Sequence, residues 1–125
     1  MQELKFVIPL PPVTKKNHGR IVRNQTSGRM HVLPSEQFLN YQDMAGYYLP
    51  DRWQEHDKPC TVKAVFYMKE HRRVDLVNLL EALDDVLVHY KVLKDDNAYI
   101  IISHDGSRVK YDKVNPRTEV SIKWE

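Results

Sequence analysis

The acidic residues between positions 75 and 96 are the strongest candidates for chemistry in this 125-residue chain. Asp75 stands where a helical pattern begins, and the pair Asp95-Asp96 closes the segment between that helix and the next strand. Two carboxylates held about 4–5 Å apart repel each other by on the order of 4 kcal/mol at an effective dielectric near 20. A hard cation such as Mg²⁺ relieves this repulsion, because it prefers oxygen ligands and completes its shell with water and phosphate. The segment therefore predicts a divalent-metal site that activates water for phosphodiester hydrolysis.

Each of these aspartates, taken alone, has a structural alternative. An aspartate that precedes a helix is commonly its N-cap, and aspartates between elements are commonly turn residues. Their joint occurrence within one short segment favours the metal site over this alternative.

Basic residues dominate a different part of the chain, although the net charge is only +2. The stretch from Thr14 to His31, called the basic arm below, contains five basic residues and no acid. A basic arm beside an acidic pocket suits a polyanion held by the arm and a metal ion held by the pocket. The alternative is two solvated surfaces of opposite sign. The basic residues of the arm are Lys15, Lys16, Arg20, Arg23 and Arg29.

Strands and helices that position these residues follow from the spacing of the apolar side chains. Prolines after residue 8 end the first strand, because proline cannot donate to a sheet ladder, and Ser35 is the expected N-cap of the first helix. The predicted elements are a strand at 4–10, a hairpin at 21–23 and 30–33, a helix from Ser35 to about Trp53, a strand at 61–68, a helix at 76–90, a strand at 99–103, a hairpin turn at 104–107 and a strand at 118–124. This order indicates one α+β domain with a mixed sheet covered by two helices.

The predicted helix at 76–90 has two distinct faces at about 100° per residue. Asn78, Glu81 and Asp85 lie opposite the apolar arc, so the helix packs one side and offers polar groups on the other. The apolar arc consists of Leu76, Leu79, Leu80, Leu83, Val86 and Leu87.

Composition and hydropathy exclude several protein classes. A hydrophobic fraction of 42% and a charged fraction of 29% are typical of globular proteins rather than disordered ones. The sequence contains no run of about 18 apolar residues, so it predicts no membrane span. The first residues lack the apolar core of a signal peptide. We therefore expect a cytoplasmic protein. The single cysteine, Cys60, is expected to be a small buried residue rather than a nucleophile.

Two further groups of side chains were weighed. His104, Asp105 and Ser107 are neighbours on one predicted turn and so cannot form a nucleophilic relay by themselves, and Asp105-Gly106 is typical of a hairpin turn. Tyr47 and Tyr48 could stack on an unpaired base, although most tyrosines serve the core or an interface.

The segment from Arg72 to Asp96 resembles the RusA-type Holliday junction resolvases. The signature of that family is a pair of basic residues, an Asp-Leu-Asp-Asn tetrad, a helix and an Asp-Asp pair. Here the tetrad reads Asp75-Leu76-Val77-Asn78, Asp95-Asp96 follows at the expected distance, and Asp85 aligns with an acid on the family's helix. The opening IPLPPVTKKN is also similar to the family's N-terminal strand and turn, so the resemblance covers nearly the whole chain.

This resemblance implies a homodimeric nuclease that binds four-way DNA junctions and makes paired, symmetric nicks with Mg²⁺ or Mn²⁺. It implies that Asp75 and Asp96 are metal ligands and catalytic residues, and it matches Arg72 and Arg73 to basic positions beside that site. Arg73, with Arg72, could hold the scissile phosphate beside the metal as a catalytic residue, or the two could be loop charges that offset Glu70 and the acidic helix. The expected DNA contacts are Lys15, Lys16, Asn17, Arg20, Arg23, Arg29, Arg72 and Arg73.

Two positions depart from the family pattern. The second aspartate of the tetrad is Val77, and the lysine expected on the helix is Glu81. Valine cannot bind a cation, so either Glu81, Asp85 or Asp95 supplies a further ligand or the site works with fewer ligands. Asp85 lies about 15 Å along a straight helix from Asp75, too far to share one metal ion unless the helix starts late. The alternatives are a junction-binding protein without cleavage activity and a general nuclease for forks and flaps.

Overall fold

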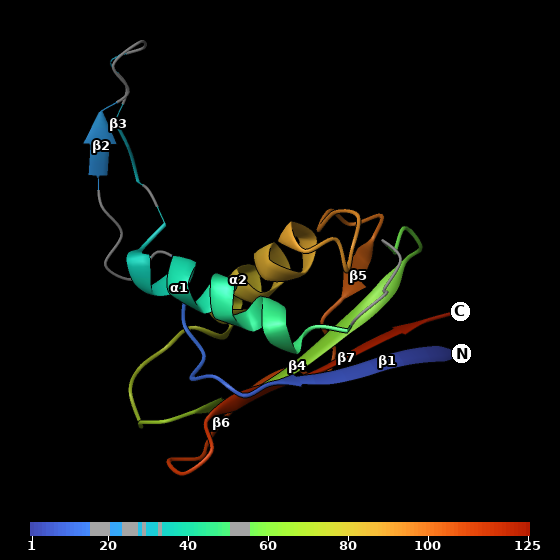
Figure 1. Cartoon of the computed structure of the whole chain (residues 1–125). Coiled ribbons are helices and arrows are strands. Elements are labelled where there is room, and N and C mark those ends of the chain that lie inside the picture. The colour runs from blue at the N-terminus through green and yellow to red at the C-terminus, as the bar shows by residue number, and fades with distance from the viewer. Residues whose placement is uncertain (16–20, 24–27, 29, 33, 51–55) are drawn as a thin grey trace.

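The main sheet of the molecule has five strands, and two helices lie on one of its faces (Figure 1). The computed structural model describes residues 1–15, 21–23, 28, 30–32, 34–50 and 56–125. The strands are β1 (Gln2–Ile8), β4 (Cys60–Met68), β5 (Ile101–Ser103), β6 (Arg108–Tyr111) and β7 (Arg117–Trp124). This architecture confirms the predicted α+β fold with a mixed sheet and two covering helices.

Strand β7 lies between β1 and β4 and is antiparallel to both. Its pairing with β1 runs from Gln2 opposite Trp124 to Ile8 opposite Thr118. Strand β4 pairs in parallel with β5 at its start and with β6 at its end. Alternate residues of β4 are buried because they point toward the helices, and these residues are Cys60, Val62, Ala64 and Phe66.

Helices α1 (Glu36–Ala45) and α2 (Leu76–His89) supply the other half of the core. Helix α2 starts and ends within one residue of its predicted bounds, because its apolar arc packs against the sheet. Among the described helices, none has the length and apolar character needed to cross a membrane.

Helix α1 begins as predicted but is shorter than predicted. The Ser35 hydroxyl accepts a hydrogen bond from the Phe38 N–H at 3.1 Å, which confirms the N-cap. The helix ends at Ala45 and continues only as a 3-10 turn, Gly46–Tyr48. The Tyr90 hydroxyl donates to the Gln42 carbonyl at 2.8 Å and so satisfies the end of the helix. The predicted extension to about Trp53 is wrong over 49–50 and lies outside the described residues at 51–55.

The predicted hairpin in the basic arm is present. Strands β2 (Ile21–Arg23) and β3 (Met30–Val32) pair antiparallel, with Ile21 opposite Val32. They form a separate two-stranded sheet that projects beyond the start of α1 (Figure 1). Strands β2 and β3 therefore lie away from the main sheet.

The prediction of a hairpin at 104–107 is wrong. Strands β5 and β6 both pair with β4, so this turn interrupts one edge of the sheet instead of joining two paired strands. The Ser107 hydroxyl accepts the Ala64 N–H at 3.0 Å and fills the gap in the ladder between β5 and β6. Gly106 has φ +86°, a left-handed conformation that accounts for the Asp-Gly signal without a hairpin.

Candidate active site

Asp75 occupies the N-cap position of α2 but does not cap the helix. Its backbone is extended (φ −90°, ψ 125°), and its side chain makes no hydrogen bond to the first-turn N–H groups. The exposed carboxylate instead accepts a long hydrogen bond, 3.4 Å, from the Asn78 side-chain amide. The structural alternative for Asp75, a side chain used for helix capping, therefore does not describe this residue.

A groove of about 520 Å³ brings Asp75 together with both of the predicted arginines. Arg72 lies 3.8 Å from Glu70 in an exposed ion pair, which is weak enough to exchange for a phosphate. Arg73 is exposed on the same loop. The groove thus places the carboxylates of Asp75 and Glu70 beside two guanidinium groups, and a phosphodiester could replace Glu70 as the partner of Arg72. Its lining residues are Pro11, Pro12, Val13, Thr14, Gln37, Met68, Lys69, Glu70, Arg72, Arg73, Val74, Asp75, Asn78 and Leu79.

Other predicted carboxylates lie farther along α2. The helix begins directly after Asp75, so the condition under which Asp85 would approach Asp75 is not met. The two residues remain about 15 Å apart along the helix axis. Glu81 lies between them, one turn before Asp85 and on the same polar face.

The far end of this polar face holds a second group of charges. The Lys15 Nζ lies 2.5 Å from the Asp85 Oδ2. This bond to Asp85 raises the pKa of Lys15, and the charges of Glu81 and Asp96 raise it further. The carboxylates of Glu81, Asp85 and Asp96, called the carboxylate cluster below, therefore all stabilise one ammonium group, and Asp85 is the one in contact with it. Lys15 was expected to contact DNA phosphates, and the structure instead places its amine on a protein carboxylate.

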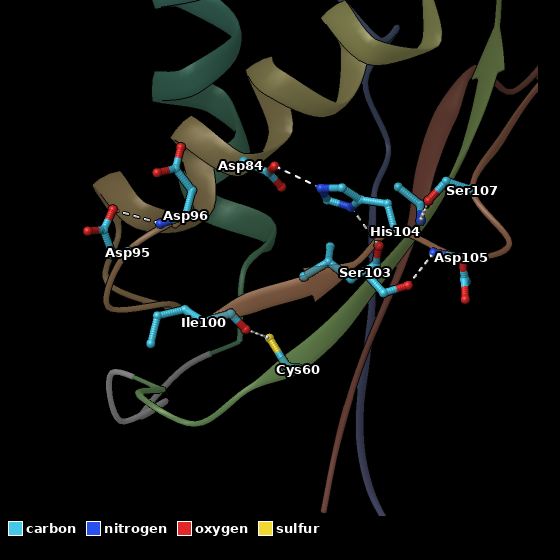
Figure 2. Close-up of polar contacts among 11 residues, drawn as sticks. Cys60, Asp84, Asp95, Asp96, Ile100, Ser103, His104, Asp105 and Ser107 are labelled. Carbon is cyan, nitrogen blue, oxygen red and sulfur yellow. Dashed lines mark hydrogen bonds and ion pairs between the residues drawn. The ribbon is translucent and has the colours of Figure 1, made fainter. Parts of the chain in front are cut away.

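The pair Asp95-Asp96 lies in the loop after α2, and its two members differ in role. Asp95 accepts a hydrogen bond from the Asp96 N–H at 2.7 Å (Figure 2). It also accepts one from the Asn97 side chain at 3.0 Å. These bonds lower the pKa of Asp95 and make it a turn residue. Partial desolvation and the neighbouring Asp95 and Asp85 raise the pKa of Asp96. Asp96 is thus the member whose charge is poorly compensated, as expected of a cation ligand.

Sequence reasoning missed a buried pair, Asp84 and His104. The Asp84 Oδ2 lies 3.0 Å from the His104 Nε2, and the His104 Nδ1 lies 2.8 Å from the Val62 carbonyl oxygen (Figure 2). The carbonyl can only accept, so Nδ1 carries a proton, and a further proton must lie between Nε2 and the carboxylate. The hydrogen bond from Asp84 raises the pKa of His104, and burial raises the pKa of Asp84. The pair therefore holds one shared proton.

A signal for this pair exists in the sequence. Asp84 falls at the border of the apolar arc on the helical wheel, between Leu80 and Glu81, and is only 9% exposed. A buried carboxylate needs a partner, and His104 at the end of β5 supplies it. The second oxygen, Asp84 Oδ1, is buried without a hydrogen-bond partner among the described residues.

Several predicted DNA contacts cannot be placed. Arg23 falls in strand β2. The remaining four lie outside the described residues, and they are Lys16, Asn17, Arg20 and Arg29.

The donors present suit a cation that needs few protein ligands. Within the described part of the chain, no three His, Cys, Asp or Glu side chains converge closely enough to hold a metal ion. The carboxylate cluster nevertheless already holds a positive charge, the Lys15 ammonium, and all of its donors are oxygens. Mg²⁺ commonly takes one or two carboxylates and completes its shell with water and substrate phosphate. The described carboxylates therefore do not form a closed metal site by themselves, and a Mg²⁺ ion there would depend on one or two of them together with a substrate phosphate.

Comparison with known families gives one match over most of the chain. The family model described as endodeoxyribonuclease RusA matches residues 9–123 of the chain, which include the groove, α2 and the Asp95-Asp96 loop. No curated protein matches the chain significantly.

Proposed function

Because the chain belongs to the endodeoxyribonuclease RusA family, we propose that it resolves four-way DNA junctions by Mg²⁺-dependent, paired cleavage of phosphodiesters. The observation that supports this most strongly is the uncapped carboxylate of Asp75 beside Arg72 and Arg73 in one groove. A purely structural N-cap would direct its carboxylate to the helix, and a purely structural loop would not need two arginines beside it.

Asp75 and Asp96 are the proposed metal ligands, and Mn²⁺ is proposed as a substitute for Mg²⁺. The bound ion would supply Lewis-acid stabilisation and an activated water. Arg73, with Arg72, binds the oxygens of the scissile phosphate and offsets charge that develops on them. Asn78 holds the Asp75 carboxylate through its side-chain amide.

Glu81 is the preferred replacement for the ligand that is absent at Val77. It lies on the polar face between Asp75 and Asp85, and its side chain is longer than that of aspartate.

A four-way junction has two equivalent strands to cut, so paired cleavage requires two sites related by two-fold symmetry. We propose a homodimer for this reason. Light scattering on the purified protein, alone and with junction DNA, measures the number of subunits.

The central test is Asp75→Asn. We expect this variant to lose cleavage of a synthetic four-way junction by at least about 100-fold in Mg²⁺, while junction binding and the melting temperature stay close to wild type. The melting temperature is unaffected because the side chain makes no capping bond. Asp105→Asn, at an exposed aspartate on the 104–107 turn, is the matched control. Full cleavage by Asp75→Asn would refute the mechanism.

Val77 is the observation that favours a second candidate function, junction binding without cleavage. It is 73% exposed and stands where the family has an aspartate. Binding without cleavage in Mg²⁺, Mn²⁺ and Co²⁺ would support this candidate. Parallel assays on junction, fork, flap and linear duplex DNA separate a resolvase from a general branched-DNA nuclease.

A further inference from the structure

Residues 69–74, called the arginine loop below, connect β4 to α2 and carry both of the arginines that line the groove. The two ends of the loop are fixed, because Met68 at the end of β4 and Val74 before α2 pack against the hydrophobic core. Arg72 makes its contacts within the loop itself. Its N–H donates to the Glu70 carbonyl at 3.0 Å, and its guanidinium lies 3.8 Å from the Glu70 carboxylate. These two contacts do not tie the arginine to the rest of the molecule.

A ring stack joins the middle of the arginine loop to the sheet. The His71 imidazole stacks on the Tyr111 ring, with the ring centroids 3.7 Å apart and the ring planes at 20°. Tyr111 is the last residue of β6 and lies opposite Met68 in the ladder with β4. The next N–H, that of Asp112, donates to the Met68 carbonyl at 2.9 Å. The stack therefore links a loop side chain to a strand residue whose backbone is held by sheet pairing.

The stacked pair lies outside both the groove and the core. Neither His71 nor Tyr111 is among the described residues that form the walls of the groove. Tyr111 is 42% exposed, and His71 is exposed as well, so burial in the hydrophobic core does not account for the pair. His71 directly precedes Arg72 in the chain. The pair can therefore act on the groove through the loop that it holds.

We propose that His71 and Tyr111 are positioning residues, which hold the arginine loop so that Arg72 and Arg73 can bind the scissile phosphate. This inference deepens the proposed function and rests on it for the role of the two arginines. A guanidinium offsets charge on a phosphate oxygen only from the correct position, and a displacement of about 1 Å can lower a rate by about 100-fold. A loop that is fixed before the substrate arrives also loses less conformational freedom when the substrate binds.

The first experiment measures how often the arginine loop opens, by limited trypsin digestion of the native, DNA-free protein. Trypsin cleaves after Lys69, Arg72 and Arg73, and the rate of this cleavage follows the population of the open loop. We expect Tyr111→Leu, which keeps apolar bulk but removes the ring, to speed cleavage at these sites about two- to tenfold, the range for loss of an aromatic pair. Tyr111 is distant in sequence from the cleaved bonds, so trypsin's own recognition is unchanged.

The controls separate loss of the stack from loss of the fold. Tyr111→Phe keeps a ring and should be cleaved at the wild-type rate. Val114→Ala, at a residue that is 94% exposed in the segment after β6, is the matched control and should also be unchanged. Equal loop cleavage in Tyr111→Leu and wild type would overturn the proposal. An equal rise at trypsin sites throughout the chain would overturn it too, because that rise reports unfolding of the whole molecule.

The second experiment measures single-turnover cleavage of a synthetic four-way junction in Mg²⁺. We expect His71→Ala and Tyr111→Leu each to lower the rate constant at saturating protein about three- to tenfold, and Tyr111→Phe to restore it. The double variant should be no slower than the slower single variant, because both changes remove the same stack. A wild-type rate in Tyr111→Leu with a trypsin-sensitive loop would overturn the positioning role. The digestion needs no DNA cleavage, so failure of the proposed function and failure of this inference are distinguishable.

Discussion

Asp75 occupies a position at which most aspartates use their carboxylate on the helix itself, and here it does not. The first turn of α2 contains no acidic residue that could interact with the backbone N–H groups at the start of the helix. The free-energy cost of leaving these N–H groups without a side-chain cap is therefore not offset within the helix. An N-cap hydrogen bond from Asp75 would stabilise the helix by about 1 kcal/mol. Without that bond, the carboxylate of Asp75 is exposed in the groove instead. This exchange is typical of a functional residue.

Val77→Asp tests whether the groove works with a reduced set of ligands. Val77 is 73% exposed, so the substitution removes little packing and should change the melting temperature only slightly. We expect tighter Mn²⁺ binding and faster junction cleavage, because a carboxylate is added two residues from Asp75. Val77→Asn is the control that adds polarity without charge. Equal gains from both variants would show that charge is not the cause.

The sequence predicted Asp75, Arg72 and Arg73 as one site because they are close along the chain, and the groove does contain all three. It did not predict the Asp84–His104 pair, since the partner of a buried carboxylate is set by how a helix lies on a sheet. Neither residue belongs to a local motif. Helical periodicity placed Asp84 at the border of the apolar arc, which indicates burial but not the partner.

Helices and strands with a strong local sequence pattern were predicted well. The errors occur where a contact with a residue distant in the sequence determines where an element ends or which strand it pairs with. The bounds of β4 and α2 follow from β-branched residues and helical spacing. The end of α1 depends on Tyr90, which is more than 40 residues away, and the edge pairing of the 104–107 turn depends on β4. A turn-forming pair such as Asp105-Gly106 indicates the backbone conformation of the turn, but it does not indicate which strand the flanking residues pair with.

Gly46→Ala tests the contact that ends α1. A Cβ atom at this position would lie 2.6 Å from the Tyr90 ring, so the ring must move and its hydroxyl must leave the Gln42 carbonyl. We expect a loss of about 1–2 kcal/mol in the free energy of unfolding by urea, although alanine favours helix. The same substitution made in a Tyr90→Ala background should be neutral or stabilising. An equal loss in both backgrounds would contradict this explanation.

The stability of the whole molecule should depend on the proton shared by Asp84 and His104. The folded-state pKa of His104 is raised above its ordinary 6.5, so its contribution is fully present below pH 6.5 and is lost as pH rises through the raised value. The pKa of Asp84 is also raised, and ionising this buried carboxylate likewise removes stability as pH rises.

His104→Gln tests this pH dependence through urea unfolding between about pH 5 and 9. The wild type should be more stable than the variant by about 1–3 kcal/mol below pH 6.5, and the difference should shrink at higher pH. Ser107→Ala is the control, because it removes a neighbouring hydrogen bond without a titratable group and should cost the same at every pH. A pH-independent difference for His104→Gln would contradict the shared proton.

The position of β7 has a consequence for the order of events during synthesis. This strand is formed by residues 117–124, yet it lies between β1 and β4 and connects them. While the ribosome is still making the earlier segments, β1 and β4 have no partner between them and α2 has no complete surface on which to pack. We therefore expect α2, and the groove at its start, to become ordered only after β7 has emerged and completed the sheet.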